Sequence, residues 1–289
     1  LILQKCKEML PYRYDKVTPQ IEARIKKELD LIQQQHYVPF FLINWDIVNY
    51  AKHKGYYHVG RGSGANSIIA YILGITDVDP IDLDLYFERF MNLYRANPPD
   101  FDIDFSWRDR EDVTRYIFDT FGKEGQVSLL ATYNTFQHKG AVRELGKVFG
   151  LPKHEIDLLS SGKYNPQALD QYAKLVHQYA QHLNGMPNHL SIHAGGVLVS
   201  ERPMHYFSAT NLPPKGFPTT QFDMHIAEDV GLYKYDILGQ RGLGKIKDAL
   251  GIIKVNRPEA PEVDIHHVKP LLEDKRINKM VSEAKCIGC

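Results

Sequence analysis

The sequence predicts an α+β protein, and three stretches of the chain support this fold class. Residues 99–105 alternate acidic and apolar side chains, as expected of a β-strand with one buried face. Residues 20–35 carry apolar side chains at three- and four-residue spacing, which is typical of an amphipathic helix. Residues 132–188 are almost wholly helical in pattern and lie between strand-like segments. We therefore expect a sheet with flanking helices and a helical subdomain inserted between its strands.

The chain has 289 residues, of which 43% are hydrophobic and 24% charged, as in a globular protein with one large or two ordinary domains. No apolar run approaches the roughly 18 residues of a membrane span, and the N-terminus does not resemble a signal peptide. We therefore expect a cytoplasmic protein with no membrane partner. Because the chain starts without methionine and stops abruptly at Cys289, we also expect a fragment of a longer protein.

The cysteine content and the net charge exclude few classes of function. Cys286 and Cys289 form a lone Cys-x-x-Cys, and a structural zinc site would need two further ligands nearby. The formal net charge is zero, which taken alone argues against nucleic-acid binding. However, an acidic metal site would cancel basic patches elsewhere, so the local distribution of charge decides the matter.

The first two expected helices are interpreted as scaffold. The helix over 20–35 has its apolar positions at Ile21, Ile25, Leu29 and Ile32. A second helix is expected over 40–53, where apolar residues dominate and Gly55 follows.

A glycine-rich loop follows the short β-prone run 56–59 and precedes an apolar helix expected over 65–73. In such a strand-loop-helix arrangement the free amide groups and the helix dipole form an anion site, to which Arg61 and Ser63 would add donors. We favour a triphosphate over two alternatives. One is an ordinary glycine turn, and the other is a dinucleotide site matched loosely through Gly60, Gly62 and Ala65. No Gly-Lys-Ser/Thr follows, which excludes a Walker A loop.

The acidic strand 99–105 is the strongest candidate for a metal site. One face would carry three aspartates and the other three apolar residues, in the order Asp100, Phe101, Asp102, Ile103, Asp104 and Phe105. Same-face neighbours lie about 6.6 to 7 Å apart, so two carboxylates can flank a pair of divalent ions about 3.5 to 4 Å apart. Carboxylates are the ligands that Mg²⁺ prefers. The alternative is a half-buried edge strand with a solvated acidic face.

Two arginines near this strand, Arg89 and Arg95, could contact phosphates or simply neutralise the carboxylates, and both interpretations stay open.

A helix ending at Gly122 and a strand over 126–132 are expected next, followed by a helix over 135–150. On that last helix Lys139, Arg143 and Lys147 are spaced at i, i+4 and i+8, which places three cations along one ridge. We favour contact with a phosphate backbone over a merely solvated face.

The remaining elements complete the sheet. Helices are expected over 154–161 and 166–183, strands over 191–199 and 231–239, and a basic helix over 241–254. Lys234 and Asp236 share one face of the strand over 231–239, and Asp236 has the same strand-borne setting as Asp100 and Asp102.

Five motifs in the same order, between about residues 21 and 250, resemble the C family of bacterial replicative DNA polymerases, the DNA polymerase III alpha subunits. These motifs are Gly60-Arg61-Gly62-Ser63 before an apolar helix, Phe87-Glu88-Arg89-Phe90, Pro99 to Phe105, Ile192 to Val197, and Lys234 to Gly239.

The resemblance implies a domain order. Residues 1–131 and 189–240 would form a palm of the polymerase-beta-like nucleotidyltransferase type, with a mixed sheet and flanking helices. Residues 132–188 would form an inserted helical thumb, and residues 241–289 the start of the fingers.

The resemblance also implies roles for individual residues. Asp100, Asp102 and Asp236 would be catalytic and hold two Mg²⁺ ions, with Asp104 as support. Gly62 and Ser63 would hold the incoming triphosphate. Cations also stand at matching motif positions. Arg61, Arg89 and Lys234 would bind the nucleotide phosphates, and Lys139 and Arg143, together with Lys147, would bind DNA.

The implied activity is template-directed DNA synthesis by transfer of a nucleotide from dNTP to a primer 3′-hydroxyl. Primer-template DNA and dNTP would be partners, as would a sliding clamp and other replicase subunits through regions absent here. Two other classes stay open, a nucleotidyltransferase that works without a template and a non-catalytic DNA-binding fragment. The intact set of carboxylates speaks against the latter.

Overall fold

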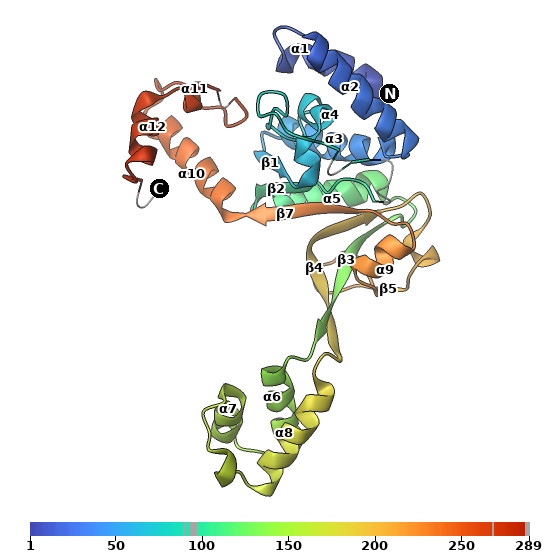
Figure 1. Ribbon diagram of the computed structural model, residues 1–289, viewed down its shortest axis with the longest axis vertical. Coiled ribbons are helices and arrows are strands. Elements are labelled where there is room, and N and C mark those ends of the chain that lie inside the picture. Colours follow the sequence, from blue (N-terminus) through green and yellow to red (C-terminus); the bar gives the residue numbers. More distant parts are fainter. Residues whose placement is uncertain (89–90, 93–96, 268, 287–289) are drawn as a thin grey trace. The chain divides into compact units, whose positions relative to one another are not determined.

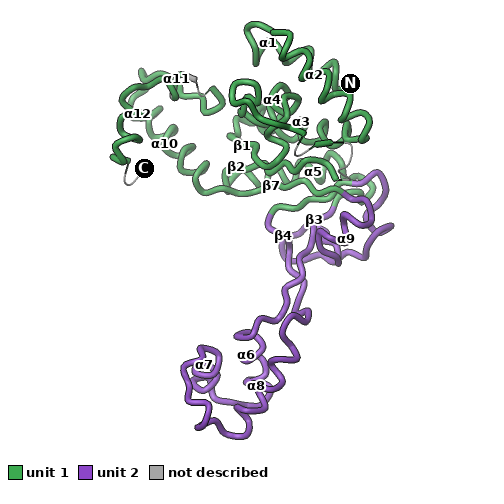
Figure 2. The backbone as a smooth tube through the Cα atoms, in the orientation of Figure 1, with its two compact units in different colours: residues 1–127, 195–199, 233–289 green, residues 128–194, 200–232 purple. Residues whose placement is uncertain are grey.

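The computed structural model describes residues 1–88, 91–92, 97–267 and 269–286, and it confirms the α+β class (Figure 1). The strands are hydrogen-bonded in the order β1-β2-β7-β4-β3-β6-β5, with both parallel and antiparallel neighbours. The chain divides into two compact units (Figure 2). The first comprises residues 1–127, 195–199 and 233–289, and the second comprises residues 128–194 and 200–232.

The first unit carries most of the helices in the described chain. It contains α1 (Ile2–Arg13), α2 (Pro19–Gln34), α3 (Val38–His53), β1 (His58–Arg61), α4 (Ile68–Ile72), β2 (Asp102–Ser106), α5 (Arg110–Phe121), β7 (Lys234–Gln240), α10 (Arg241–Asn256), α11 (Lys269–Leu272) and α12 (Lys275–Ser282).

The second unit combines a helical part with short strands. It contains β3 (Val127–Thr135, from its second residue), α6 (His138–Val148), α7 (Lys153–Ser161), α8 (Gln171–Leu183), β5 (Thr210–Asn211), β6 (Thr219–Thr220) and α9 (Met224–Asp229). Strand β4 (Pro187–Val199) begins in the second unit and ends in the first.

Strand β2 has the alternation that its sequence predicts. Phe101, Ile103 and Phe105 are buried, whereas the aspartates between them face the other side. Strand β1 runs antiparallel and β7 parallel to β2. Successive strands of a dinucleotide-binding βαβ unit run parallel, so the antiparallel β1–β2 pair excludes the dinucleotide alternative for the glycine loop.

Helix α3 covers the apolar side of this part of the sheet. The ring of Phe40 stacks on Phe101 at a centroid distance of 5.6 Å and lies 5.1 Å from the ring of Tyr235. Phe41 meets Phe101 edge-on at 5.1 Å. Because these rings exclude water from one face, the acidic side chains are confined to the other face.

The expected helix over 65–73 is wrong at its start. Residues Ser63–Asn66 form a single 3-10 turn, and Ser67 is extended with φ −87° and ψ 128° before α4 begins at Ile68. The Ser67 side chain accepts hydrogen bonds from the amides of Ile69 and Ala70. The physical reason is therefore an N-cap: serine competes for helix amides and starts a new helix instead of continuing the old turn.

Glu28, a fully buried residue of α2, also holds the start of α4. Its carboxylate accepts hydrogen bonds from the Ser67 hydroxyl at 2.6 Å and the Ile68 amide at 3.2 Å. Arg24 donates to the same carboxylate at 2.6 Å. Burial raises the pKa of Glu28 more than these hydrogen bonds and the Arg24 charge lower it.

Two further expectations differ in detail. The helix expected over 166–183 is a 3-10 turn Pro166–Ala168 followed by α8, which Asp170 caps through the Ala173 amide. The helical stretch expected over 132–188 is shorter, because β3 continues to Thr135 and β4 starts at Pro187.

Helices α6, α7 and α8 share a small core of their own. Its buried members are Ala141, Val142, Leu159, Ala173, Val176 and Ala180. The helical part of the second unit therefore has an apolar centre, as the sequence pattern predicts.

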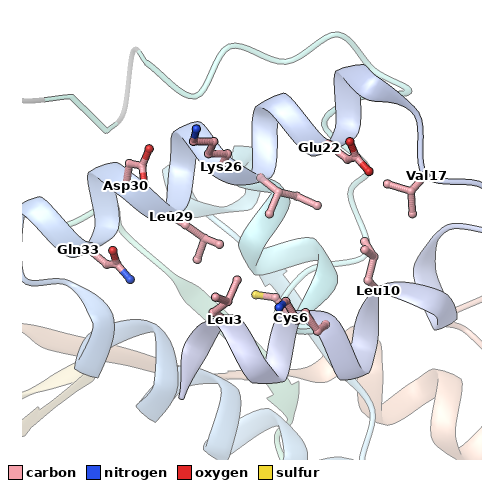
Figure 3. A pocket seen from close by; sticks show the side chains of 11 residues that line it. Leu3, Cys6, Leu10, Val17, Glu22, Lys26, Leu29, Asp30 and Gln33 are labelled. Carbon is pink, nitrogen blue, oxygen red and sulfur yellow. The ribbon is translucent and has the colours of Figure 1, made fainter.

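Helix α1 was not expected from the sequence. It contains Pro11, and its buried residues are Ile2 and Cys6. Between α1 and α2 lies a cavity of about 460 Å³ that includes Leu3, Leu10 and Leu29 in its lining (Figure 3). No residue of the acidic strand lines this cavity. Burial raises the pKa of the Cys6 thiol to about 12.

Across the described residues, no helix is both long and apolar enough to span a membrane.

Replacing Glu28 with Ala should destabilise the first unit by about 3–5 kcal/mol, because it leaves the buried donors of Arg24, Ser67 and Ile68 without their acceptor. Urea unfolding followed by circular dichroism measures the change. Asp30→Ala removes an exposed carboxylate from the same helix and serves as the control, with an expected change within about 0.5 kcal/mol. Equal effects of the two substitutions would contradict the role given to Glu28.

Candidate functional site

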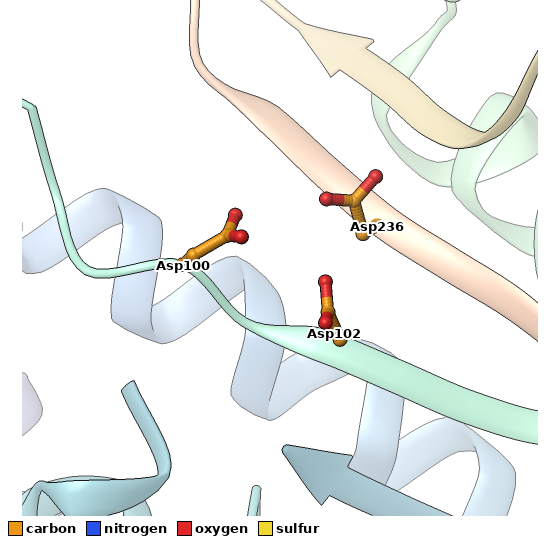
Figure 4. A group of neighbouring side chains, drawn as sticks. All are labelled: Asp100, Asp102 and Asp236. Carbon is orange, nitrogen blue, oxygen red and sulfur yellow. The ribbon is translucent and has the colours of Figure 1, made fainter. Parts of the chain in front are cut away.

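Three carboxylates, two on strands and one just before a strand, meet in the first unit. Each of Asp100, Asp102 and Asp236 offers one oxygen such that all three oxygens lie within 4.8 Å of one another (Figure 4). Asp102 and Asp236 are directly paired across the parallel strands β2 and β7, and Asp100 lies just before β2. The chain thus brings together residues more than 130 positions apart, as the sequence motifs lead us to expect.

The glycine loop fixes the position of Asp100. The Asp100 amide donates to Ser63 Oγ at 2.9 Å, and the Gly64 amide donates to the Asp100 carbonyl at 2.9 Å. These two hydrogen bonds tie the loop after β1 to the residue that enters β2. The loop and the backbone of Asp100 therefore form one local structure.

Two glycines permit close approach at this site. Gly62 has φ +90°, and a Cβ there would lie 2.5 Å from the Asp100 carbonyl oxygen. A Cβ at Gly195 on β4 would lie 2.5 Å from Leu238 Cδ2 and 3.3 Å from a carboxylate oxygen of Asp236. Gly62 therefore leaves no room for a side chain, whereas a side chain at Gly195 would require Leu238 to shift.

Arg61 binds two of the carboxylates on β2. Its Nη1 donates to Asp102 at 2.6 Å, while its Nε donates to Asp104 at 2.7 Å and its Nη2 to the other oxygen of Asp104 at 3.2 Å. Gln240 Nε2 lies 3.4 Å from Asp104. This fork to Asp104 orients the guanidinium and leaves one of its nitrogens for Asp102.

Lys234 binds the other two carboxylates, those of Asp100 and Asp236. It shares a face of β7 with Asp236, and its ammonium donates to Asp236 and to Asp100, the latter at 3.0 Å. Burial lowers the pKa of Lys234, but the hydrogen bonds and charges of Asp236 and Asp100 outweigh this effect, so the net shift is upward. Lys234 is therefore held in its charged form.

The environment of Asp102 opposes its ionisation. Partial burial raises its pKa, and the negative charges of Asp100 and Asp236 raise it further, against the opposing charges of Arg61 and Lys234. With Asp104 included, four carboxylates face two cations, so negative charge is in excess at the site. Such an excess favours a cation.

The donor set fits a hard divalent ion. The three residues of the cluster offer only carboxylate oxygens, which suit Mg²⁺ and not the softer metals that prefer nitrogen or sulfur. Asp236 is buried, while 48% of the Asp100 side chain and 20% of the Asp102 side chain are exposed, so the cluster is open toward solvent.

The amides at the start of α4 do not contribute an anion site, contrary to the expectation for the glycine loop. The amides of residues 68–70 are already occupied by Glu28 and Ser67. Of the expected phosphate ligands in this region, the structure leaves Arg61, Gly62 and Ser63 of the loop as candidates. Arg89 and Arg95 lie outside the described residues.

The three cations on α6 belong to the second unit. Lys139, Arg143 and Lys147 are exposed along this helix, as the spacing predicts. Arg143 forms an ion pair with Asp157 at 3.0 Å, and Lys147 one with Glu144 at 2.6 Å. Exposed ion pairs of this kind contribute little to stability, so these cations can readily leave their partners for another anion.

Two functional contacts were missed from the sequence alone. Glu28 stands in the buried stripe of α2, seven residues after Ile21 and four before Ile32, and a charge in such a stripe is the signal that could have identified it. Gln240 continues the face of β7 that carries Lys234 and Asp236, so strand alternation could have identified it.

Comparison with known proteins places the site in context. The family model described as the bacterial DNA polymerase III alpha NTPase domain matches residues 1–239. An error-prone DNA polymerase of Symbiobacterium thermophilum is 36% identical over 260 residues, which are 83% of this chain and 24% of that protein.

Two further relatives cover nearly the whole chain. An error-prone DNA polymerase of Anaeromyxobacter dehalogenans is 32% identical over 100% of this chain and 28% of its own length. The DNA polymerase III subunit alpha of Bacillus subtilis is 35% identical over 98% of this chain and 27% of its own length. The chain therefore spans about a quarter of the length of these relatives.

Replacing Gly62 with Ala should cost about 1–3 kcal/mol in backbone strain, and the clash with the Asp100 carbonyl should add to it. We expect this substitution to displace Asp100 and to weaken Mn²⁺ binding at least tenfold. Urea unfolding and isothermal titration calorimetry measure the two effects.

Gly216→Ala is the matched control, because Gly216 has φ +81° but open space around its Cβ position. It should be destabilising by only about 1–2 kcal/mol and leave Mn²⁺ affinity unchanged. If both variants bind Mn²⁺ as the unmodified chain does, the contact between the loop and Asp100 does not position the cluster.

Proposed function

The chain belongs to the bacterial DNA polymerase III alpha family, and from this premise we propose that it carries the nucleotidyl-transfer site of a template-directed DNA polymerase. The observation that carries the proposal is the convergence of Asp100, Asp102 and Asp236, with their oxygens within 4.8 Å of one another. We propose that these residues hold two Mg²⁺ ions. The ions would lower the pKa of the primer 3′-hydroxyl and offset the negative charge on the leaving pyrophosphate.

The residues around the carboxylates have separate tasks in this proposal. Asp102 and Asp236, paired across β2 and β7, hold their oxygens rigidly because both are part of the sheet. Asp100 is anchored by the loop through Ser63 and Gly64. Rigid ligands that need no rearrangement during the reaction are the main requirement for stabilising charge that develops in the transition state.

Arg61 and Lys234 are the cations next to the proposed phosphate position. Arg61 is 47% exposed, so its guanidinium can reach a triphosphate while Asp104 still fixes its orientation. Gly62 and Ser63 add the backbone of the loop and one hydroxyl donor. Arg89, an expected phosphate ligand, remains a proposal from its motif alone.

We propose the domain order that the motifs imply: a palm over residues 1–131 and 189–240, an inserted thumb over residues 132–188, and the start of the fingers over residues 241–289. In this proposal the palm carries β1, β2 and β7, the thumb carries α6, α7 and α8, and the fingers begin with α10. The thumb would contact the phosphate backbone of primer-template DNA through Lys139, Arg143 and Lys147. No residue of this chain is assigned to a sliding clamp or to other replicase subunits.

Asp102→Asn in the full-length protein that carries this sequence should lower Mg²⁺-dependent primer extension about 10²-fold or more, because the site loses a ligand that positions charge in the transition state. Primer extension with a labelled primer, with and without template, measures both rate and template dependence. More than about a tenth of the original activity in the variant would refute the assignment.

The control for that measurement is Asp119→Asn, which removes an exposed carboxylate from α5 and should leave the rate unchanged. Extension that continues without template would favour a nucleotidyltransferase of the non-templated kind.

Replacing Lys139, Arg143 and Lys147 with Met should weaken duplex binding and reduce the slope of log K against log salt by about 2 to 3, because each phosphate contact contributes about 0.9. Fluorescence anisotropy with a primer-template duplex between about 50 and 200 mM salt measures this slope. The control loses three exposed lysines from elsewhere in the second unit, at Lys163, Lys174 and Lys215. Similar slopes for the two triple variants would argue against the ridge on α6.

A further inference from the structure

Lys234 bridges two of the three carboxylates of the acidic cluster. Its ammonium contacts Asp236 on β7 and Asp100 before β2, so it links two of the three carboxylates and both chain segments that supply them. Only 19% of its side chain is exposed. Arg61 differs, because it contacts the third carboxylate, Asp102, from the side where Asp104 lies.

The carboxylates that bind Lys234 belong to the same set that would bind a divalent ion. Asp100 and Asp236 supply two of the three carboxylates of the candidate metal site, and the ammonium contacts an oxygen of each. An ammonium and a divalent ion cannot share these oxygens without strong repulsion at such short range. Binding of one therefore opposes binding of the other.

We infer that Lys234 is a resident counter-ion of the metal site, which gives up its contacts with Asp100 and Asp236 when a divalent ion binds. This inference rests on the proposed metal site. In the absence of the ion, Lys234 reduces the repulsion among the carboxylates and keeps them close together. When it is released, its side chain on β7 remains next to the site and can bind a phosphate of the incoming nucleotide.

The inference predicts that Lys234 measurably weakens metal binding. Because the first metal ion must displace the ammonium from Asp100 and Asp236, Lys234 lowers the affinity of the site for that ion. Metal binding releases Lys234, and the released side chain can bind the triphosphate. Metal and triphosphate would then each raise the affinity for the other, since coupling between two binding events is reciprocal. Substrate would thus bind best to a site that already holds metal.

The first test measures Mn²⁺ affinity by isothermal titration calorimetry in the 289-residue chain without nucleotide or DNA. Lys234→Met should bind Mn²⁺ about tenfold more tightly than the unmodified chain, because the competing cation is gone. Lys247→Met is the matched control, since Lys247 pairs with Asp109 at 2.7 Å outside the cluster. The Mn²⁺ affinity of this variant should equal that of the unmodified chain. Equal or weaker binding by Lys234→Met overturns the inference.

A third variant separates this inference from the proposed function. Asp236→Asn should abolish or strongly weaken Mn²⁺ binding if the cluster is the metal site. If it does so while Lys234→Met has no effect, the metal site stands and only the counter-ion role fails. If Asp236→Asn changes nothing, the metal site and the inference fail together.

A second readout needs no substitution. Lysine labelling with an N-hydroxysuccinimide acetate, followed by mass spectrometry, should modify Lys234 faster when Mn²⁺ is saturating, because the ammonium has left its carboxylate partners. Lys247 should react at the same rate with and without Mn²⁺. A rate at Lys234 that does not depend on Mn²⁺ would overturn the inference even if the variants do not fold.

Discussion

The site depends on holding four carboxylates together against their mutual repulsion. Asp100, Asp102 and Asp236 approach within a few ångströms, and Asp104 lies beside them on the same strand face. The apolar side of β2 is buried against α3, so these groups cannot turn away from one another. The compensation comes from two internal cations, each of which joins two carboxylates. The sheet, the glycine loop and the two cations therefore act together to hold the carboxylates in place.

Close backbone approach is the second requirement. The loop after β1 can reach the Asp100 carbonyl only because Gly62 has no side chain, and β4 passes close to Asp236 at Gly195, where a Cβ would crowd Leu238. Glu28 makes a similar contribution from further away, since its buried carboxylate fixes where α4 starts after the loop. The glycines thus determine ligand geometry although they provide no ligand themselves.

Sequence patterns predict the local features of this site well and its long-range contacts poorly. The alternation over 99–105 predicts the buried and acidic faces of β2, and the helix expected over 20–35 is found as α2. The continuous helix expected over 65–73 was wrong, because the pattern of apolar residues does not reveal that Ser67 caps a new helix. Pairing of Asp102 with Asp236 depends on the register of two strands far apart in the chain, which no local pattern specifies.

Charge contacts follow the same rule. Lys234 was expected to bind phosphate from its motif position, and its contacts with Asp100 and Asp236 could only be found once β7 had been placed beside β2. Glu28 was visible in the helical stripe of α2, but the three groups that it binds were not.

The most direct test of the two-metal account is anomalous diffraction from crystals of the chain soaked with Mn²⁺ and a non-hydrolysable dNTP analogue. The account predicts two manganese peaks about 3.5–4 Å apart, both within coordination distance of Asp100 and Asp102 and one of them also of Asp236. The triphosphate should lie against Arg61 and the loop at Gly62. A fully occupied analogue with no manganese at the three carboxylates would contradict the account.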